Sequence, residues 1–179
     1  KRYGKNFSKR IFTAYTQEDC YSYRFLLDEK DVSPTIIHQW FDIGKRIEID
    51  ELDHKIMGLI SKNSRLSTID MAKALDTTST VVQYRLKKLM DLELIIAFRI
   101  HIDFSKIGYY MYKVDIDLNN FDKVENIINY IISNPNFDFI CKTIGYVDLE
   151  IAFILNNSQQ LHQIMEDLSK DYEQRIKHL

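Results

Sequence analysis

The sequence contains few of the residues that interrupt or cross-link a chain: two Pro, five Gly and two Cys in 179 residues. So little proline and glycine excludes a collagen-like or low-complexity chain. Two cysteines far apart in sequence, Cys20 and Cys141, exclude a disulfide scaffold, and we expect both to be reduced and buried. No stretch has the pattern of a signal peptide or a membrane span, so we expect a cytoplasmic protein without a membrane partner.

The short motifs of common enzymes are absent as well. The sequence contains no P-loop, no G-x-S-x-G, no H-E-x-x-H and no C-x-x-C. Its histidines stand singly, at His38, His54, His101, His162 and His178, which is typical of surface or half-buried histidine rather than of metal ligands. We therefore expect a protein that is not an enzyme, with no catalytic residue, no cofactor and no metal site.

Residues 49–98 carry the strongest pattern and predict three short helices followed by a strand. The first helix begins at Asp50, whose side chain can accept from a free backbone N–H, with Asp53 in its first turn. Its apolar residues recur at helical spacing: Leu52, Ile56, Leu59 and Ile60. The second begins with S-T-I-D at Ser67, and the third follows the turn-forming D-T-T-S of residues 76–79. Two helices separated by so few residues form a helix-turn-helix, and the strand would make it winged.

The spacing also predicts which faces these two helices bury. Ile69, Ala72 and Leu75 share one face of the second helix, and Val82, Leu86 and Leu89 share one face of the third. At about 100° per residue, the third helix then turns Thr80, Gln83, Tyr84 and Lys87 outward.

The outward face of the third helix suits double-stranded DNA. Glutamine can bond adenine in the major groove, threonine can meet a thymine methyl, and lysine neutralises phosphate. We predict that eight residues contact DNA: Ser79, Thr80, Gln83, Tyr84, Arg85, Lys87, Lys88 and Arg99. A plain solvated helix face, with Arg85 paired to an acidic residue, is the alternative.

These helices resemble the Lrp/AsnC, or feast/famine, regulators. The family's L-D-x-x-D-x-x-I-L pattern is met by Ile49, Asp50, Asp53, Ile56 and Met57, and its N-x-R by Asn63 and Arg65. Its leucine-alanine second helix is similar to Met71, Ala72 and Leu75, and its recognition-helix pattern is similar to Thr78, Val81, Val82, Arg85, Leu86 and Leu89. Asp76 and Glu93 stand where the family has glycine, so we expect the turns there to differ.

The rest of the chain predicts a ferredoxin-like unit. Strands are expected at 110–118, 137–142 and 149–155, and amphipathic helices at 121–132 and 161–172. This strand-helix-strand-strand-helix order lacks the final strand of a ferredoxin-like fold. It resembles the family's RAM domain, which implies effector binding at the G-x-x-D motif, here Gly145, Tyr146, Val147 and Asp148. An ordinary turn between strands is the alternative.

Residues 1–48 are expected to form an N-terminal α/β extension. Residues 11–15 and 21–27 look like strands around Q-E-D, and a short helix is predicted from Ser33 through Phe41. Either strand would supply the missing strand of the RAM sheet. Alternatively, K-R-Y-G-K-N-F-S-K-R at the start aligns with K-D-Y-E-Q-R-I-K-H-L at the end, which would make residues 1–28 the end of a preceding RAM-like module.

The predicted fold class is therefore α+β. The extension at 1–48 is followed by a winged helix-turn-helix at 49–104 and a RAM domain at 105–179. We expect a regulator that binds DNA as a homodimer or higher oligomer through its RAM domain and responds to an amino-acid effector. With a net charge of −2, a monomer should bind DNA weakly and salt-sensitively.

Two other functions fit the same architecture. Siroheme decarboxylases resemble Lrp/AsnC proteins, and Arg99 with His101 is the pair that would suggest a tetrapyrrole pocket. A module that only assembles, with a silent helix-turn-helix, is the other alternative.

Overall fold

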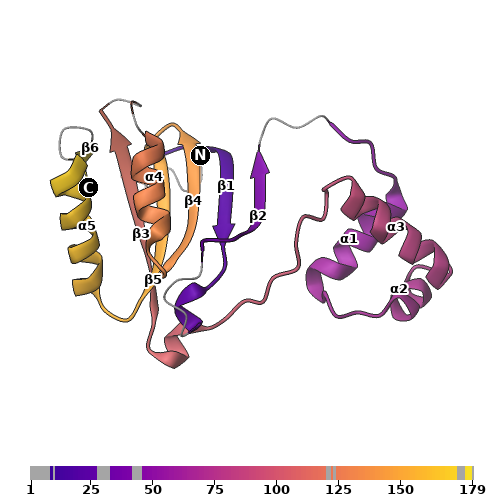
Figure 1. Cartoon of the computed structure of the whole chain (residues 1–179). Helices are drawn as coiled ribbons and strands as arrows, with labels where there is room; N and C mark the ends of the chain where they lie inside the picture. Colours follow the sequence, from indigo (N-terminus) through magenta and orange to yellow (C-terminus); the bar gives the residue numbers. More distant parts are fainter. Residues whose placement is uncertain are drawn as a thin grey trace. The chain divides into compact units, whose positions relative to one another are not determined.

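The computed structural model describes residues 9, 11–27, 33–41, 46–119, 122, 124–172 and 176–178. The chain forms two compact units (Figure 1). The helical unit is Gly44–Ile100, and the sheet unit combines Lys1–Ile43 with His101–Leu179. Of the ten N-terminal residues that align with the C-terminal end, all but Lys9 lie outside the described residues.

The helical unit has the three helices that the sequence predicts: α1 (Glu51–Lys62), α2 (Thr68–Ala74) and α3 (Ser79–Asp91). Each begins at a side chain that accepts a hydrogen bond from a backbone N–H three residues on: Asp50, Ser67 and Thr78. At α1 the Asp53 carboxylate also accepts from the Asp50 N–H, which completes a capping box. The predicted helix starts are therefore confirmed.

Helices α2 and α3 bury the side chains that hold this unit together. Met71, Ala72 and Val82 form a buried cluster, and Leu66 and Leu86 pack against it. The prediction that Ile69 shares the buried face of α2 is wrong, because its side chain is 58% exposed. A helix of seven residues has about two turns, and Met71 and Ala72 occupy the side that meets α3.

The strand predicted after α3 is not formed among the described residues of this unit. Residues 96–103 have no regular secondary structure. Ile96, Phe98 and Ile100 alternate along this segment and are exposed. A strand is stable only when a second strand satisfies its backbone groups, and the helical unit supplies none among its described residues.

The sheet unit is built on one antiparallel sheet of six strands in the order β2-β1-β4-β5-β3-β6. Its strands are β1 (Ala14–Tyr21), β2 (Ile36–Phe41), β3 (Tyr110–Leu118), β4 (Phe137–Ile144), β5 (Leu149–Leu155) and β6 (Ile176–His178). Helix α4 (Val124–Ser133) follows β3, and α5 (Ser158–Tyr172) follows β5. The order β4-β5-β3-β6 is that of a ferredoxin-like fold, as predicted.

The closing strand of the ferredoxin-like fold is present, so the prediction that it is missing is wrong. Strand β6 pairs with β3 through Asp117–His178 and Leu118–Ile176. Three residues are too few to show a strand period in the sequence. Because β6 pairs only at the end of β3, most of that edge of β3 has no strand beside it among the described residues.

The N-terminal segment adds two strands at the opposite edge of the sheet. Strand β1 runs through the polar residues Q-E-D and pairs with β4 on one side and β2 on the other. The two strands predicted around Q-E-D are therefore one strand, followed by a 3₁₀ turn at Arg24–Leu26. The predicted helix from Ser33 to Phe41 is wrong, because Ile36–Phe41 forms β2. Its β-branched and aromatic residues suit an edge strand once β1 is beside it.

The core of the sheet unit lies between the sheet and helices α4 and α5. Ile127 and Ile131 of α4 and Leu168 of α5 are almost fully buried against Phe137 and Phe153. The two phenylalanine rings lie 5.7 Å apart and meet edge to face. No helix in the described part of the chain is long and apolar enough to cross a membrane.

Candidate functional site

Helix α3 presents the polar face that the sequence predicts. Thr80, Gln83, Tyr84 and Lys87 are exposed, and the Tyr84 side chain is 67% exposed. On the opposite side Val82 and Leu89 are fully buried. The helix therefore has a threonine, a glutamine, a tyrosine and a lysine available for an external ligand.

Two of the predicted DNA-binding residues are held by carboxylates of α1 and its cap. The Arg85 guanidinium pairs with Asp50, and its Nη1 lies 3.2 Å from Asp53 Oδ1. The Lys88 Nζ lies 3.0 Å from Asp53 Oδ2. Both basic side chains are only partly exposed, at 24% and 33%. Arg85 and Lys88 therefore fix α3 against α1, and their charges are balanced within the unit.

Asp53 is the centre of this arrangement, and its side chain is fully buried. Burial disfavours its charged form, but hydrogen bonds from Lys88 and from the Asp50 N–H hold the pKa of Asp53 below its usual value. The pKa of Asp50 is also lowered, first by the hydrogen bond from the Asp53 N–H and then by Arg85. The sequence places Asp53 at the helix start but does not reveal that it is buried.

Contacts of its first and last residues fix the G-Y-V-D loop between β4 and β5. The backbone of Gly145 has φ +135°, and a Cβ there would lie 2.4 Å from the Phe12 carbonyl oxygen. The Asp148 carboxylate accepts from the Leu118 N–H at 2.8 Å, and the Asp148 N–H donates to the Ile116 carbonyl at 3.0 Å. Gly145 and Asp148 therefore have structural roles in the loop.

The middle of the same loop faces a cavity of about 620 Å³ beside β3 and α5. It is lined by Lys113, Val114, Asp115, Asp117, Tyr146, Val147, Leu161, His162 and Met165. Lys113 Nζ lies 3.1 Å from Asp115 Oδ1 and 3.0 Å from Glu150 Oε2. Burial disfavours the cation, but these carboxylates raise the pKa of Lys113. The cavity thus combines both signs of charge with an apolar wall.

Comparisons with known proteins agree with both units. A family described as "Winged helix-turn-helix DNA-binding" matches residues 49–96. LrpC of Bacillus subtilis superimposes with a TM-score of 0.61 at 20% identity, over 69% of this chain and 89% of that one. AsnC of Escherichia coli gives 0.62 at 17% identity, over 74% and 89%. The chain has the fold of the Lrp/AsnC regulators.

Relatives in sequence include two HTH-type transcriptional regulators whose own roles are uncharacterized. One from Pyrococcus furiosus is 40% identical over 63 residues, and the match spans 35% of this chain and 43% of that protein. One from Pyrococcus abyssi is 25% identical over 118 residues, spanning 66% and 80%. A structure of a Neisseria meningitidis transcriptional regulator in complex with L-Met has a TM-score of 0.62 at 13% identity, over 73% and 86%.

The Lrp/AsnC-like helical unit keeps its turns where the sequence lacks the family's glycines. Asp76 has φ +51° and Glu93 has φ +55°, so both adopt the left-handed backbone that glycine favours. The expectation that these turns differ is therefore not met. The left-handed backbone at these two residues lowers the stability of the fold, because a left-handed non-glycine residue is strained by about 1–2 kcal/mol.

The pair considered for a tetrapyrrole pocket is split between the two units of this Lrp/AsnC-like chain. Arg99 belongs to the helical unit and lines a groove of about 470 Å³ with Met57, Ile60 and Phe98. His101 belongs to the sheet unit and is exposed. Neither unit by itself supplies this pair.

Both cysteines are buried and form no disulfide, as predicted. Burial, and then the nearby carboxylates of Glu18 and Glu150, raise the pKa of the Cys141 thiol to about 12. Cys20 lies beside Glu18 and His38, a grouping that the sequence analysis missed. These residues come from β1 and β2, and only the pairing of the two strands brings them together.

Proposed function

We propose that this chain is a sequence-specific DNA-binding transcriptional regulator of the Lrp/AsnC type. The observation that carries the proposal is the exposed face of α3, presented by a helix-turn-helix that is capped at each helix and held by the Asp53 ion pairs. A rigid polar helix that protrudes by one face fits the major groove. The family match over residues 49–96 supports the same ligand. The proposal assigns the chain no catalytic residue.

The residues predicted to contact DNA fall into groups by their chemistry. Thr80 and Gln83 would contact base edges, and Ser79 and Tyr84 bases or nearby phosphates. Lys87 and Arg99 would neutralise backbone phosphates. Arg85 and Lys88 would act mainly by positioning α3, because Asp50 and Asp53 already balance their charges.

We expect the regulator to act as a homodimer or higher oligomer assembled through its ferredoxin-like unit. Two recognition helices would then enter successive major grooves, roughly 34 Å apart on one side of the duplex. Linking two weak contacts raises the overall affinity without any new contact. Because the proposed ligand is chromosomal DNA, we expect a cytoplasmic location.

The cavity beside β3 is the proposed effector site. Its volume of about 620 Å³ lies in the range of small-molecule sites. An amino acid is zwitterionic, so Asp117 would attract its ammonium group, and Lys113 and His162 its carboxylate. Leu161 and Met165 would contact an apolar side chain. The complex of a structural neighbour with L-Met supports this class of ligand.

Selection of bound fragments from the source genome, at near-physiological salt and with excess competitor DNA, tests the DNA-binding proposal. A shared, pseudo-palindromic site is the expected outcome, and its half-site spacing would report the dimer geometry. Recovery of nothing above competitor would overturn sequence-specific binding and favour a metabolite-binding or catalytic protein with a silent helix-turn-helix.

Calorimetric titration with single amino acids tests the effector site separately. At least one apolar amino acid should bind the wild type, and Asp117→Asn should weaken binding by about tenfold or more, since it removes the carboxylate that faces the ammonium group. Asp91→Asn, on the helical unit, is the matched control and should bind as the wild type does. If no amino acid binds, or if both variants bind equally, the cavity is not an amino-acid site.

A further inference from the structure

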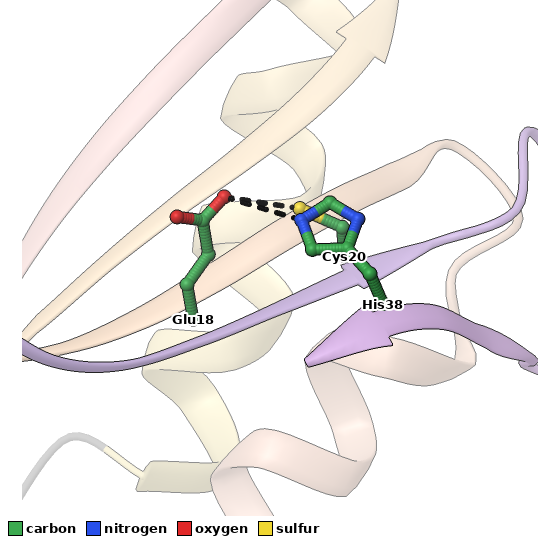
Figure 2. A group of neighbouring side chains, drawn as sticks. All are labelled: Glu18, Cys20 and His38. Carbon is green, nitrogen blue, oxygen red and sulfur yellow. Dashed lines mark hydrogen bonds and ion pairs between the residues drawn. The ribbon is translucent and has the colours of Figure 1, made fainter. Parts of the chain in front are cut away.

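The pairing of β1 and β2 brings three metal-ligand side chains together at the edge of the sheet. Glu18 and Cys20 are two residues apart on β1, so they lie on the same face of the strand. His38 of β2 is directly opposite Cys20 in the register, and Trp40 is directly opposite Glu18. Figure 2 shows the carboxylate, thiol and imidazole converging on one point.

The separations of these atoms suit a tetrahedral ion. The Cys20 Sγ lies 3.1 Å and the His38 Nε2 3.8 Å from the Glu18 Oε1, and all three ligand atoms lie within 4.8 Å of one another. Bonds of about 2.3 Å to sulfur and 2.0 Å to nitrogen or oxygen put tetrahedral ligands about 3.3–3.5 Å apart. Small side-chain movements would therefore seat an ion.

The surroundings hold the cluster in place, and no described residue makes a close hydrogen bond to its imidazole. Cys20 is 1% exposed, and the side chain of His38 is 13% exposed. The Nε2 contact with Glu18 is too long for a hydrogen bond, and Nδ1 is buried without a partner in the described part of the chain. Trp40 Nε1 donates to Glu18 Oε2 at 2.9 Å, which turns the other carboxylate oxygen toward Cys20 and His38.

We propose that Glu18, Cys20 and His38 bind a zinc-class divalent transition metal ion that ties the edge strand β2 to β1. A thiolate with an imidazole and a carboxylate is a donor set for zinc and its neighbours, whereas calcium and magnesium take oxygen ligands. On binding, the Cys20 thiol loses its proton to solvent and the sulfur–metal bond forms. Three protein ligands leave a fourth position for water.

Such an ion would stabilise one edge of the sheet. Within the described ranges, strand β2 lies at the edge of the sheet and pairs with β1 alone, and Ile36 and Ile37 on it are exposed. A metal that binds the folded and not the unfolded chain stabilises the fold, and above its dissociation constant the gain rises with the logarithm of the free metal concentration. The site would therefore have a structural role, and it lies in a different unit from the DNA-binding face on α3.

Titration of the metal-free 179-residue chain with Zn²⁺ and with Co²⁺ tests the site. The wild type should bind one ion, with a thiolate-to-cobalt charge-transfer band in the Co²⁺ spectrum, and Zn²⁺ should slow hydrogen exchange in β1 and β2. Cys20→Ser should abolish the band. Cys141→Ser, which alters the other buried cysteine, is the matched control and should keep it.

A second pair of variants separates metal binding from folding. Glu18→Gln keeps the size of a partly exposed side chain and should weaken Zn²⁺ binding at least tenfold, with an unchanged near-ultraviolet circular dichroism spectrum. Trp40→Phe keeps an aromatic ring but removes the hydrogen bond to Glu18, and it should weaken binding about 10–100-fold, as expected for a residue that orients a ligand. Absence of the cobalt band in the folded wild type, or its persistence in Cys20→Ser, would overturn the proposal.

Discussion

Different interactions stabilise the two units of this chain. In the helical unit, each helix starts at its own cap, and a buried carboxylate with two bases links α1 to α3. In the sheet unit, a large apolar core is assembled from strands far apart in sequence, and the residues that β1 pairs with on β4 are 119–130 positions away in the chain. The helical unit therefore combines local helix caps and buried ion pairs with a small apolar cluster, whereas the sheet unit depends on a large apolar core built by non-local pairing.

This difference explains what each unit offers to a ligand. Polar pairs inside the helical unit fix α3 while its outer face stays available. In the sheet unit a cavity lies beside β3 and α5, and the β1–β2 edge brings three metal-ligand side chains together. The predictions below perturb one unit while the other serves as its reference.

The largest effect is expected from Phe153→Ala in the sheet unit. Phe153 is fully buried and meets Phe137 edge to face, so its truncation leaves a cavity and should cost about 3–5 kcal/mol of unfolding free energy. Hydrogen exchange read by mass spectrometry should show faster exchange across β3 to β5 and little change in α1 to α3. Phe98→Ala, at a 57% exposed side chain, should change stability by less than about 0.5 kcal/mol.

A smaller loss, confined to the helical unit, is expected from Asp53→Asn. The amide keeps the size of the side chain but removes the charge that Arg85 and Lys88 contact, at a cost of about 2–3 kcal/mol. Exchange should accelerate in α1 to α3 alone. Asp91→Asn, at an exposed position of α3, should leave exchange unchanged. Equal losses in both units would mean that they unfold as one.

Asp53 also makes the stability of the helical unit depend on pH. Because the folded pKa of Asp53 lies below its usual value, its contribution is fully present above about pH 4 and is lost as the pH falls through the lowered pKa. The helical unit of the wild type should therefore lose stability in acid, as measured by urea unfolding followed by helical circular dichroism. Asp53→Asn should show a flatter dependence below pH 4, and an unchanged slope would contradict this role.

The smallest effect, and the one stabilising change, is expected from Glu93→Gly. Glu93 has φ +55°, a conformation that glycine adopts without strain, so the substitution should stabilise the helical unit by about 0.5–1 kcal/mol. Glu93→Ala keeps the Cβ and should give no gain. Thermal unfolding of the three proteins would distinguish backbone strain from loss of the Glu93 charge.

Elements with a local signal could be predicted from the sequence. Asp50, Ser67 and Thr78 mark helix starts with their side chains, and the alternation in 110–118 predicts β3 with its observed bounds. Elements fixed by non-local pairing could not be predicted from the sequence. Q-E-D resembles a turn until β4 and β2 flank it, and β6 has three residues.

The sites divide in the same way. The polar face of α3 follows from helical spacing, so Gln83 and Lys87 could be predicted as exposed. The burial of Asp53, and the ion pairs that hold Arg85 and Lys88, depend on how α1 packs on α3. Glu18, Cys20 and His38 meet only through strand register, which a single sequence does not show.

The central claim is that α3 docks in the major groove, and the most direct test is DNA affinity measured as a function of salt concentration. The wild type, Gln83→Ala and Lys87→Ala are each compared on the selected site and on competitor DNA. Gln83→Ala should lose about 1–3 kcal/mol on the selected site and little on competitor, while Lys87→Ala should weaken both alike and lower the salt slope by about one. Equal effects of the two variants on both DNAs would contradict the docking of α3 in the major groove.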